Sequence, residues 1–179
     1  MFRRQGRQAF KPIIYRGIDN MVLATKVANL MEEHNPDAVF CDSGGGGGVI
    51  DRLRQLKYDV IEIPFGGRAI HPDKYINRRT EMWWLMKEWV EEGGAIPDDV
   101  ALKQELATPI YWYDNVGRRV LESKDQIKKR LQGGGSPDLA DALALTFALP
   151  VGKKQPEDIY IKRRKEATQK TDYDPYKVI

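Results

Sequence analysis

The order of apolar and polar positions predicts alternating helices and short strands. Apolar residues at helical spacing predict four helices, over residues 20–34, 49–56, 80–92 and 139–149. Short apolar runs at 38–41 and 60–63 are typical of strands. Because a predicted helix lies between these two runs, we expect a βαβ unit with parallel strands. The pattern therefore predicts an α/β fold.

Turn and cap residues add two hairpins and two shorter helices. Gly6 is expected in a hairpin turn that precedes the extended segment 10–15. Asp114–Gly117 separates two apolar segments and is typical of a hairpin turn. Shorter helices are expected to begin at Asp98 and at Ser123. The sequence of predicted elements contains no internal repeat.

Ser43 and five glycines, Gly44–Gly48, lie between the first predicted strand of the βαβ unit and its helix, and we expect them to form a loop. The residues that follow are Val-Ile-Asp and lack the Lys-Ser/Thr of a P-loop. Backbone N–H groups of Gly46, Gly47 and Gly48 are candidates for holding a DNA phosphate at the start of the helix. A plain flexible turn explains the run equally well.

Composition limits the class of protein and the kind of metal site. The 179 residues suffice for one compact domain, which we expect over residues 1–150. Hydrophobic residues make up 41% and charged residues 31%, which excludes a collagen-like or largely disordered chain. With one cysteine, Cys41, and two histidines, any metal would be held mainly by carboxylates. No apolar run is long enough to span a bilayer, so we expect a cytoplasmic protein without membrane contact.

The net charge of +3 is concentrated near the C-terminus. Residues 152–179 contain eight Lys/Arg and five Asp/Glu, whereas residues 1–151 contain 21 of each. Two explanations fit this basic tail (151–179) equally well. It contacts a phosphate backbone through Lys162, Arg163 and Arg164, or it is a solvated flexible segment. A second basic set lies near the predicted 114–117 hairpin and suits either DNA phosphates or an ordinary solvated helix face: Arg118, Arg119, Lys124 and Lys128.

Three aspartates form the candidate chemical site. Asp42 ends a predicted parallel strand, where open α/β sheets place ligand-binding groups. Asp138 and Asp141 are three residues apart on one helix, so their side chains share a face. Asp42 as a turn residue or cap, and one helix aspartate as a cap, are the structural alternatives. Converging carboxylates suit Mg²⁺ or Mn²⁺, and two such ions support phosphodiester hydrolysis.

An ordered set of short motifs resembles the C-terminal nuclease domain of the large terminase subunit of tailed bacteriophages and prophages. Each motif alone is weak, but together they cover about residues 10–150. The set consists of Phe40–Ser43 with its glycine run, Val49–Leu53, Ile61–Gly66, Asn77–Trp83, Glu122–Asp125 and Ser136–Leu143. The resemblance implies an RNase H-like α/β fold, with a mixed sheet flanked by helices and an inserted β-hairpin.

The resemblance also implies an activity. The family cuts concatemeric viral DNA with two divalent ions while the DNA is packaged at the procapsid portal of the host cell. Asp42 matches the strand acid of the family and Asp141 its helix acid, with Asp138 a further ligand or a neighbour that tunes it. Double-stranded DNA, the portal protein and the small terminase subunit are the expected partners.

The sequence departs from this family pattern in two respects. The ATPase motor and its ATP site are missing from this chain, so translocation of DNA is not expected of it. The first strand, which carries another metal-binding Asp, is not found before Met1, so we expect an incomplete sheet. Two rivals remain: a RuvC-like junction resolvase, and a non-catalytic terminase fragment that binds DNA or the portal.

Overall fold

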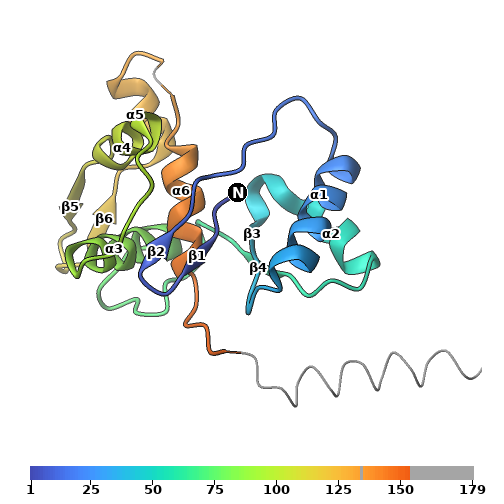
Figure 1. Ribbon diagram of the computed structural model, residues 1–179. Coiled ribbons are helices and arrows are strands. Elements are labelled where there is room, and N and C mark those ends of the chain that lie inside the picture. Colours follow the sequence, from blue (N-terminus) through green and yellow to red (C-terminus); the bar gives the residue numbers. More distant parts are fainter. Residues whose placement is uncertain (134, 154–179) are drawn as a thin grey trace, which may run out of the picture.

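The computed structural model describes residues 1–133 and 135–153. The helices in this part of the chain are α1 (Asn20–His34), α2 (Ser43–Gln55), α3 (Arg78–Glu91), α4 (Val100–Ala107), α5 (Lys124–Arg130), α6 (Asp138–Ala144) and the 3₁₀-helix η1 (Leu145–Phe147). The strands are β1 (Arg4–Gln5), β2 (Gln8–Ala9), β3 (Phe40–Asp42), β4 (Ile61–Ile63), β5 (Tyr111–Tyr113) and β6 (Arg119–Leu121). The α/β prediction is therefore confirmed (Figure 1).

The strands pair differently from the expected single mixed sheet. In the described residues they form three two-stranded sheets, β1–β2, β3–β4 and β5–β6. β3 and β4 are parallel and joined through α2, which confirms the βαβ unit. β1–β2 and β5–β6 are antiparallel hairpins that turn at Gly6 and at Asp114–Gly117, as predicted. Each strand has only two or three residues, and isolated bridges join Gln8 to Ala95 and Tyr75 to Arg119 beyond these pairs.

The glycine run is helical, so the predicted loop is wrong. α2 begins directly after β3 at Ser43, and the Asp42 side chain caps it by accepting the Gly44 N–H at 3.1 Å. Gly46, Gly47 and Gly48 lie past the first turn, so their N–H groups donate within the helix ladder. These three glycines therefore do not form a phosphate loop. A good cap and a buried face over Val49–Leu53 outweigh the poor helix propensity of the glycines.

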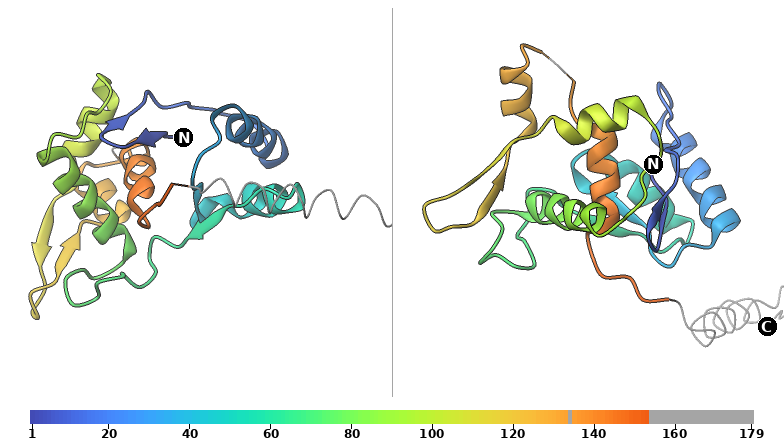
Figure 2. Two further views of the ribbon diagram at one scale, coloured as in Figure 1. Left: turned by 60° about the horizontal axis from the view of Figure 1, so that its bottom comes forward. Right: turned by 60° about the vertical axis from the view of Figure 1, so that its left-hand side comes forward.

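Two apolar clusters form the core. The left view of Figure 2 shows the helices they join, with α1 and α2 at one end of the ribbon and α3 and α4 at the other. One packs α1 against α2 and Val60, and includes Ala24 and Leu53, both fully buried. The other surrounds α3, α4 and α6, with Met82 and Leu143 at its centre. η1 packs against β3 and so links the two clusters. The ends of β3 and β4 line one pocket together with the starts of α3 and α5.

The last predicted helix is shorter than expected. α6 ends at Ala144 and continues as the 3₁₀ turn η1, whereas the sequence predicted a helix over residues 139–149. No helix of the described residues is both long and apolar enough to span a bilayer. The predicted DNA contacts Lys162, Arg163 and Arg164 lie outside the described residues.

The helical glycines generate a stability prediction. A Cβ added at Gly47 meets no atom within 4 Å, and its backbone is helical. We expect Gly47→Ala to raise the free energy of unfolding by about 0.5–1 kcal/mol, because alanine favours the helix. Urea unfolding of both proteins measures the difference. At Gly48 a Cβ would lie 2.6 Å from Nδ2 of Asn20, so Gly48→Ala should gain less. A destabilised Gly47→Ala would contradict a helical run.

Candidate active site

Four junctions between elements line one pocket of about 520 Å³. They are the end of β3 with the start of α2, the loop after β4, the start of α3, and the end of β6 with the start of α5. The lining residues that carry chemistry are Asp42, Ser43, Asn77, Arg79, Ser123 and Lys124. Ends of parallel strands and starts of helices thus meet where α/β folds place ligands.

Asp42 lies on the wall of this pocket and is half-buried. Its Oδ1 accepts the Gly44 N–H that begins α2. The Asp42 side chain is therefore a helix cap, as the structural alternative predicted. It also lies in the pocket, where a metal-binding role requires a carboxylate. Only one contact to its two oxygens is present in the described residues, so capping leaves lone pairs for a ligand.

Asp141 is buried, with 3% of its surface exposed, and is held by three polar side chains. Its Oδ1 accepts hydrogen bonds from Arg79 Nε at 2.8 Å and from Trp83 Nε1 at 2.6 Å. Lys124 Nζ lies 3.0 Å from Oδ2, without hydrogen-bond angles, so that contact is a charge pair. A buried carboxylate requires such partners, and Oδ2 retains hydrogen-bonding capacity.

Lys124 also donates a hydrogen bond to Asp138 Oδ1 at 3.0 Å, so one ammonium group joins both helix aspartates. Desolvation acts to lower the pKa of Lys124, but Asp138 and Asp141 outweigh it and raise that pKa. Desolvation acts to raise the pKa of Asp138, but the hydrogen bond from Lys124 and the charges of Lys124 and Lys128 favour the carboxylate, and that pKa is lowered. Lys124 and Asp138 are therefore both charged at neutral pH.

The three predicted acids are not gathered into one ligand set. Asp42 lines the pocket, Asp141 is buried behind Arg79 and Lys124, and the Asp138 side chain is 73% exposed. Within the described residues no group of three or more Asp, Glu, His or Cys is placed to hold a metal ion. The structure thus brings Asp138 and Asp141 together on one cation, Lys124, and leaves Asp42 on the pocket wall.

The other basic residues predicted to bind DNA differ in availability. Arg118 is paired with Asp114 at 2.7 Å, and Arg119 lies over the rings of Trp84 and Tyr75. Lys128 is exposed on α5. Lys124 lines the pocket itself.

Comparison with known proteins identifies the fold. The nuclease domain of the large terminase subunit gp2 of bacterial virus Sf6 matches with a TM-score of 0.66 at 20% identity, over 84% of this chain and 81% of that chain. A structure of that domain with manganese gives 0.64 at 19%, over 83% and 82%. The large terminase nuclease of thermophilic phage G20c, with bound magnesium, gives 0.50 at 18%, over 74% and 62%.

The chain has the fold of a terminase nuclease domain. No protein-family model matches the sequence, and the search of curated proteins finds no significant match. Identity near 20% supports the shared fold, whereas activity has to be argued from the site.

The most informative residue that sequence reasoning missed is Arg79. It hydrogen-bonds Asp141 through Nε and the Glu122 carbonyl through Nη1, both at 2.8 Å, and its side chain is 9% exposed. A signal was present, because Arg78 and Arg79 occupy the first turn of α3, where the helix dipole disfavours cations. An arginine at such a position indicates a specific anionic partner.

Glu105 of α4 was also missed, and it supplies the cap that α6 lacks. Pro137 precedes α6 without a capping side chain, and Glu105 Oε2 instead accepts the N–H groups of Leu139 at 2.6 Å and Ala140 at 3.0 Å. Burial raises the pKa of Glu105, although these two hydrogen bonds oppose the rise. Glu105 thereby fixes the start of the helix that carries Asp141.

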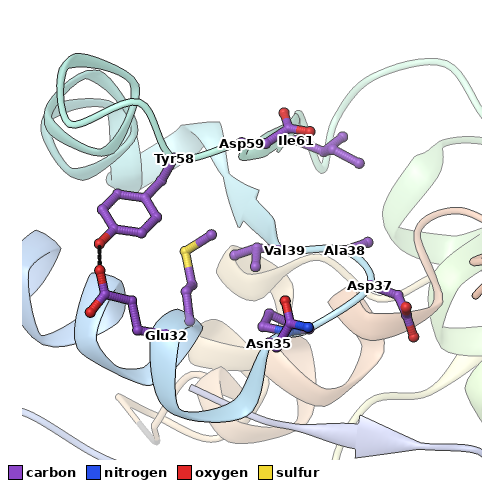
Figure 3. A pocket seen from close by; sticks show the side chains of 10 residues that line it. Glu32, Asn35, Asp37, Ala38, Val39, Tyr58, Asp59 and Ile61 are labelled. Atoms are coloured by element: carbon purple, nitrogen blue, oxygen red, sulfur yellow. Dashed lines mark hydrogen bonds between the residues drawn. The ribbon is translucent and has the colours of Figure 1, made fainter. Parts of the chain in front are cut away.

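A second pocket, of about 270 Å³, lies where β3 and β4 begin, away from the predicted site (Figure 3). Among its lining residues, Tyr58 donates a hydrogen bond to Glu32, and this bond raises the pKa of Tyr58. None of the predicted site residues lines it. The candidate active site is therefore the larger pocket beside Asp42.

We expect Glu105→Ala to lower the free energy of unfolding by about 1–2 kcal/mol, the usual range for a lost helix cap. Thermal or urea unfolding measures the loss. Gln104→Ala is the matched control, because Gln104 is an exposed neighbour on α4. Equal stability of the two variants would contradict the capping role.

Proposed function

We propose that this chain is a divalent-metal-dependent endonuclease that cuts concatemeric viral DNA during genome packaging. The observation that carries the proposal is the pocket at the ends of β3 and β4, where Asp42 lies beside the Arg79–Lys124–Asp141 cluster. The fold shared with the terminase nuclease domains of Sf6 and G20c supports it. Those structures are described with manganese, calcium or magnesium, which supports divalent-metal dependence.

The candidate ligands are carboxylate oxygens, whose chemistry suits a hard cation, although the described residues do not gather them into one group. Asp141 Oδ2 is buried without a hydrogen bond, Asp138 and Asp141 already share one cationic group, and Asp42 presents free lone pairs. Asp42 and Asp141 would hold the metal, with Asp138 a further ligand. When bound, two Mg²⁺ or Mn²⁺ ions supply activation of a nucleophilic water and charge neutralisation at the phosphate.

Basic residues of the chain bind the DNA in this proposal. Lys124 lies on the pocket wall, where its charge attracts a phosphate, and Lys128 continues this basic surface along α5. Arg118, Arg119, Lys162, Arg163 and Arg164 remain proposed DNA contacts. We place this work in the host bacterial cytoplasm at the procapsid portal, with the portal protein and the small terminase subunit as partners.

A second function, DNA binding without cleavage, is favoured by one observation. The described residues contain no group of three metal-binding side chains. A terminase fragment of this kind would bind DNA through its basic residues and leave cleavage to another chain. Cleavage assays separate the two functions.

The first test of the nuclease proposal is cleavage of supercoiled plasmid with Mn²⁺ or Mg²⁺. We expect cleavage by the parent chain, with Asp42→Asn and Asp141→Asn at least 100-fold slower, about the loss that follows removal of a metal ligand. Agarose gels measure nicked and linear products.

Asp51→Asn is the matched control, because Asp51 is an exposed acid on α2 outside the pocket. It should cleave like the parent. If both site variants cut at the parental rate, the acid assignment is wrong. If the parent binds DNA but never cuts, the binding function replaces the nuclease.

Lys124 occupies the carboxylate oxygens that a metal would use, which generates a second prediction. We expect Lys124→Gln to bind Mn²⁺ about tenfold more tightly, because a competing cation is removed from Asp138 and Asp141. Isothermal titration calorimetry measures the affinity. Lys129→Gln, an exposed charge change on the same helix, should leave it unchanged. Weaker binding in Lys124→Gln would show that Lys124 supports the metal site.

A further inference from the structure

The β5–β6 hairpin has an open sheet edge along β5. Both views of Figure 2 show this hairpin, in yellow, at the margin of the ribbon. Ile110 and Asp114 hydrogen-bond the β6 side of the hairpin at 2.9 Å, the first through its carbonyl and the second through its N–H. Because alternate residues of an antiparallel strand direct these groups to opposite sides, the backbone N–H and C=O groups of Tyr111 and Tyr113 face away from β6.

The opposite edge of this small sheet is already covered. Arg119 of β6 donates its N–H to the Lys74 carbonyl at 2.8 Å and accepts the Ile76 N–H at 3.0 Å. On β5, in contrast, no segment outside the hairpin hydrogen-bonds the backbone of Tyr111 or Tyr113 in the described part of the chain. The outward backbone groups of these two tyrosines therefore form a ladder to which another strand can add.

β5 also exposes aromatic side chains on both of its faces. Tyr111 is 49% exposed, Trp112 38% and Tyr113 55%. The two tyrosine rings share one face, with their centroids 6.1 Å apart, and the Tyr111 ring makes an edge contact with Trp84 at 5.1 Å. Trp112 lies on the other face, because side chains alternate along a strand. Exposed Tyr and Trp are typical of a surface that binds protein.

β5 lacks the features that normally prevent edge pairing. Natural edge strands carry lysines, prolines or bulges that block the addition of another strand. β5 consists of Tyr-Trp-Tyr and has no charge, and the neighbouring Asp114 is paired with Arg118 at 2.7 Å inside the hairpin. Pro109 precedes Ile110 and has no N–H, so it limits any added pairing to a short stretch.

We propose that β5 pairs antiparallel with β5 of a second copy of this chain, across a two-fold axis at Trp112. In this register Tyr111 faces Tyr113 of the second copy, so the outward backbone groups meet as hydrogen-bonded pairs. Trp112 faces its own counterpart in a non-hydrogen-bonded pair, where side chains lie closest. The order Tyr-Trp-Tyr reads the same in both directions, so each position of β5 meets an aromatic residue and no like charges face one another.

The proposed interface is small, so the dimer is expected to be weak. Stable interfaces bury about 800 Å² on each partner, more than a strand of three residues offers. We expect a dissociation constant on the order of 0.1 mM. Sedimentation equilibrium of the full chain, from about 10 μM to about 1 mM, should show a monomer that converts to a dimer. This association goes beyond the proposed DNA cleavage and does not require it.

Opposite charges at the two-fold axis test the register. We expect Trp112→Lys and Trp112→Glu each to stay monomeric up to about 1 mM, because like charges would face one another across the axis. An equimolar mixture of the two variants should associate, since opposite charges then meet. Val116→Lys is the matched control, because Val116 is 75% exposed in the hairpin turn outside β5. This control should dimerise like the parent, and circular dichroism shows whether each variant is folded.

Hydrogen exchange of the parent tests the same edge without any variant. The N–H groups of Tyr111 and Tyr113 should exchange about threefold more slowly at 1 mM than at 50 μM, by mass action with the expected dissociation constant. The Trp112 N–H faces β6 and should exchange at the same rate at both concentrations. NMR measures the three rates, and this measurement decides where a Trp112 variant fails to fold.

Four outcomes would overturn the proposal. The parent stays monomeric at every concentration, or its dimer persists equally in Trp112→Lys, which places the interface elsewhere. Folded Trp112→Lys and Trp112→Glu do not associate when mixed, which rejects the two-fold register. Exchange at Tyr111 and Tyr113 does not depend on concentration. A monomeric parent whose Tyr111 and Tyr113 signals shift with single-stranded DNA would assign the edge to nucleic acid instead.

Discussion

The buried carboxylate of Asp141 is the interaction on which the rest of the site depends. It accepts hydrogen bonds from Arg79 and Trp83 on α3 and faces Lys124 on α5, so one acid connects three helices. Removing a charge from water is unfavourable unless partners surround it, and removal of one partner leaves the others uncompensated. The packing of α3 against α6 and the position of Lys124 therefore both depend on the Asp141 side chain.

Further contacts around Asp141 fix the positions of the residues that form the pocket wall. Arg79 reaches the Glu122 carbonyl, and the Glu122 carboxylate is paired with Arg130. This pairing with Arg130 outweighs burial and lowers the pKa of Glu122. Glu105 holds the first N–H groups of α6. Because each group has a fixed partner, the wall of the pocket is built before any ligand arrives, as a preorganised site requires.

The sequence predicted the parts of this structure that depend on local pattern. α1, the βαβ unit, the hairpin at Asp114–Gly117 and the Ser123 cap follow from periodicity and turn chemistry, and the structure confirms them. The helical glycine run could not be predicted, because a cap and tertiary packing override glycine's low propensity. Pairing of Asp141 with Arg79 spans 62 residues of sequence, so only the fold brings the two together.

Asp42 and Asp141 are both carboxylates, but the fold holds their side chains to different degrees. Asp141 is buried and saturated at Oδ1, so its position is rigid, whereas Asp42 is half-buried and holds a single N–H of a glycine-rich turn. Consecutive glycines in that turn cost helix stability, about 1 kcal/mol each relative to alanine, and no side chain of theirs fills the space in front of it. The proposed substrate, DNA, is a bulky, charged polymer, and its entry would gain from this division. The rigid acid sets the geometry, and the lightly held acid lies where the backbone leaves the approach open.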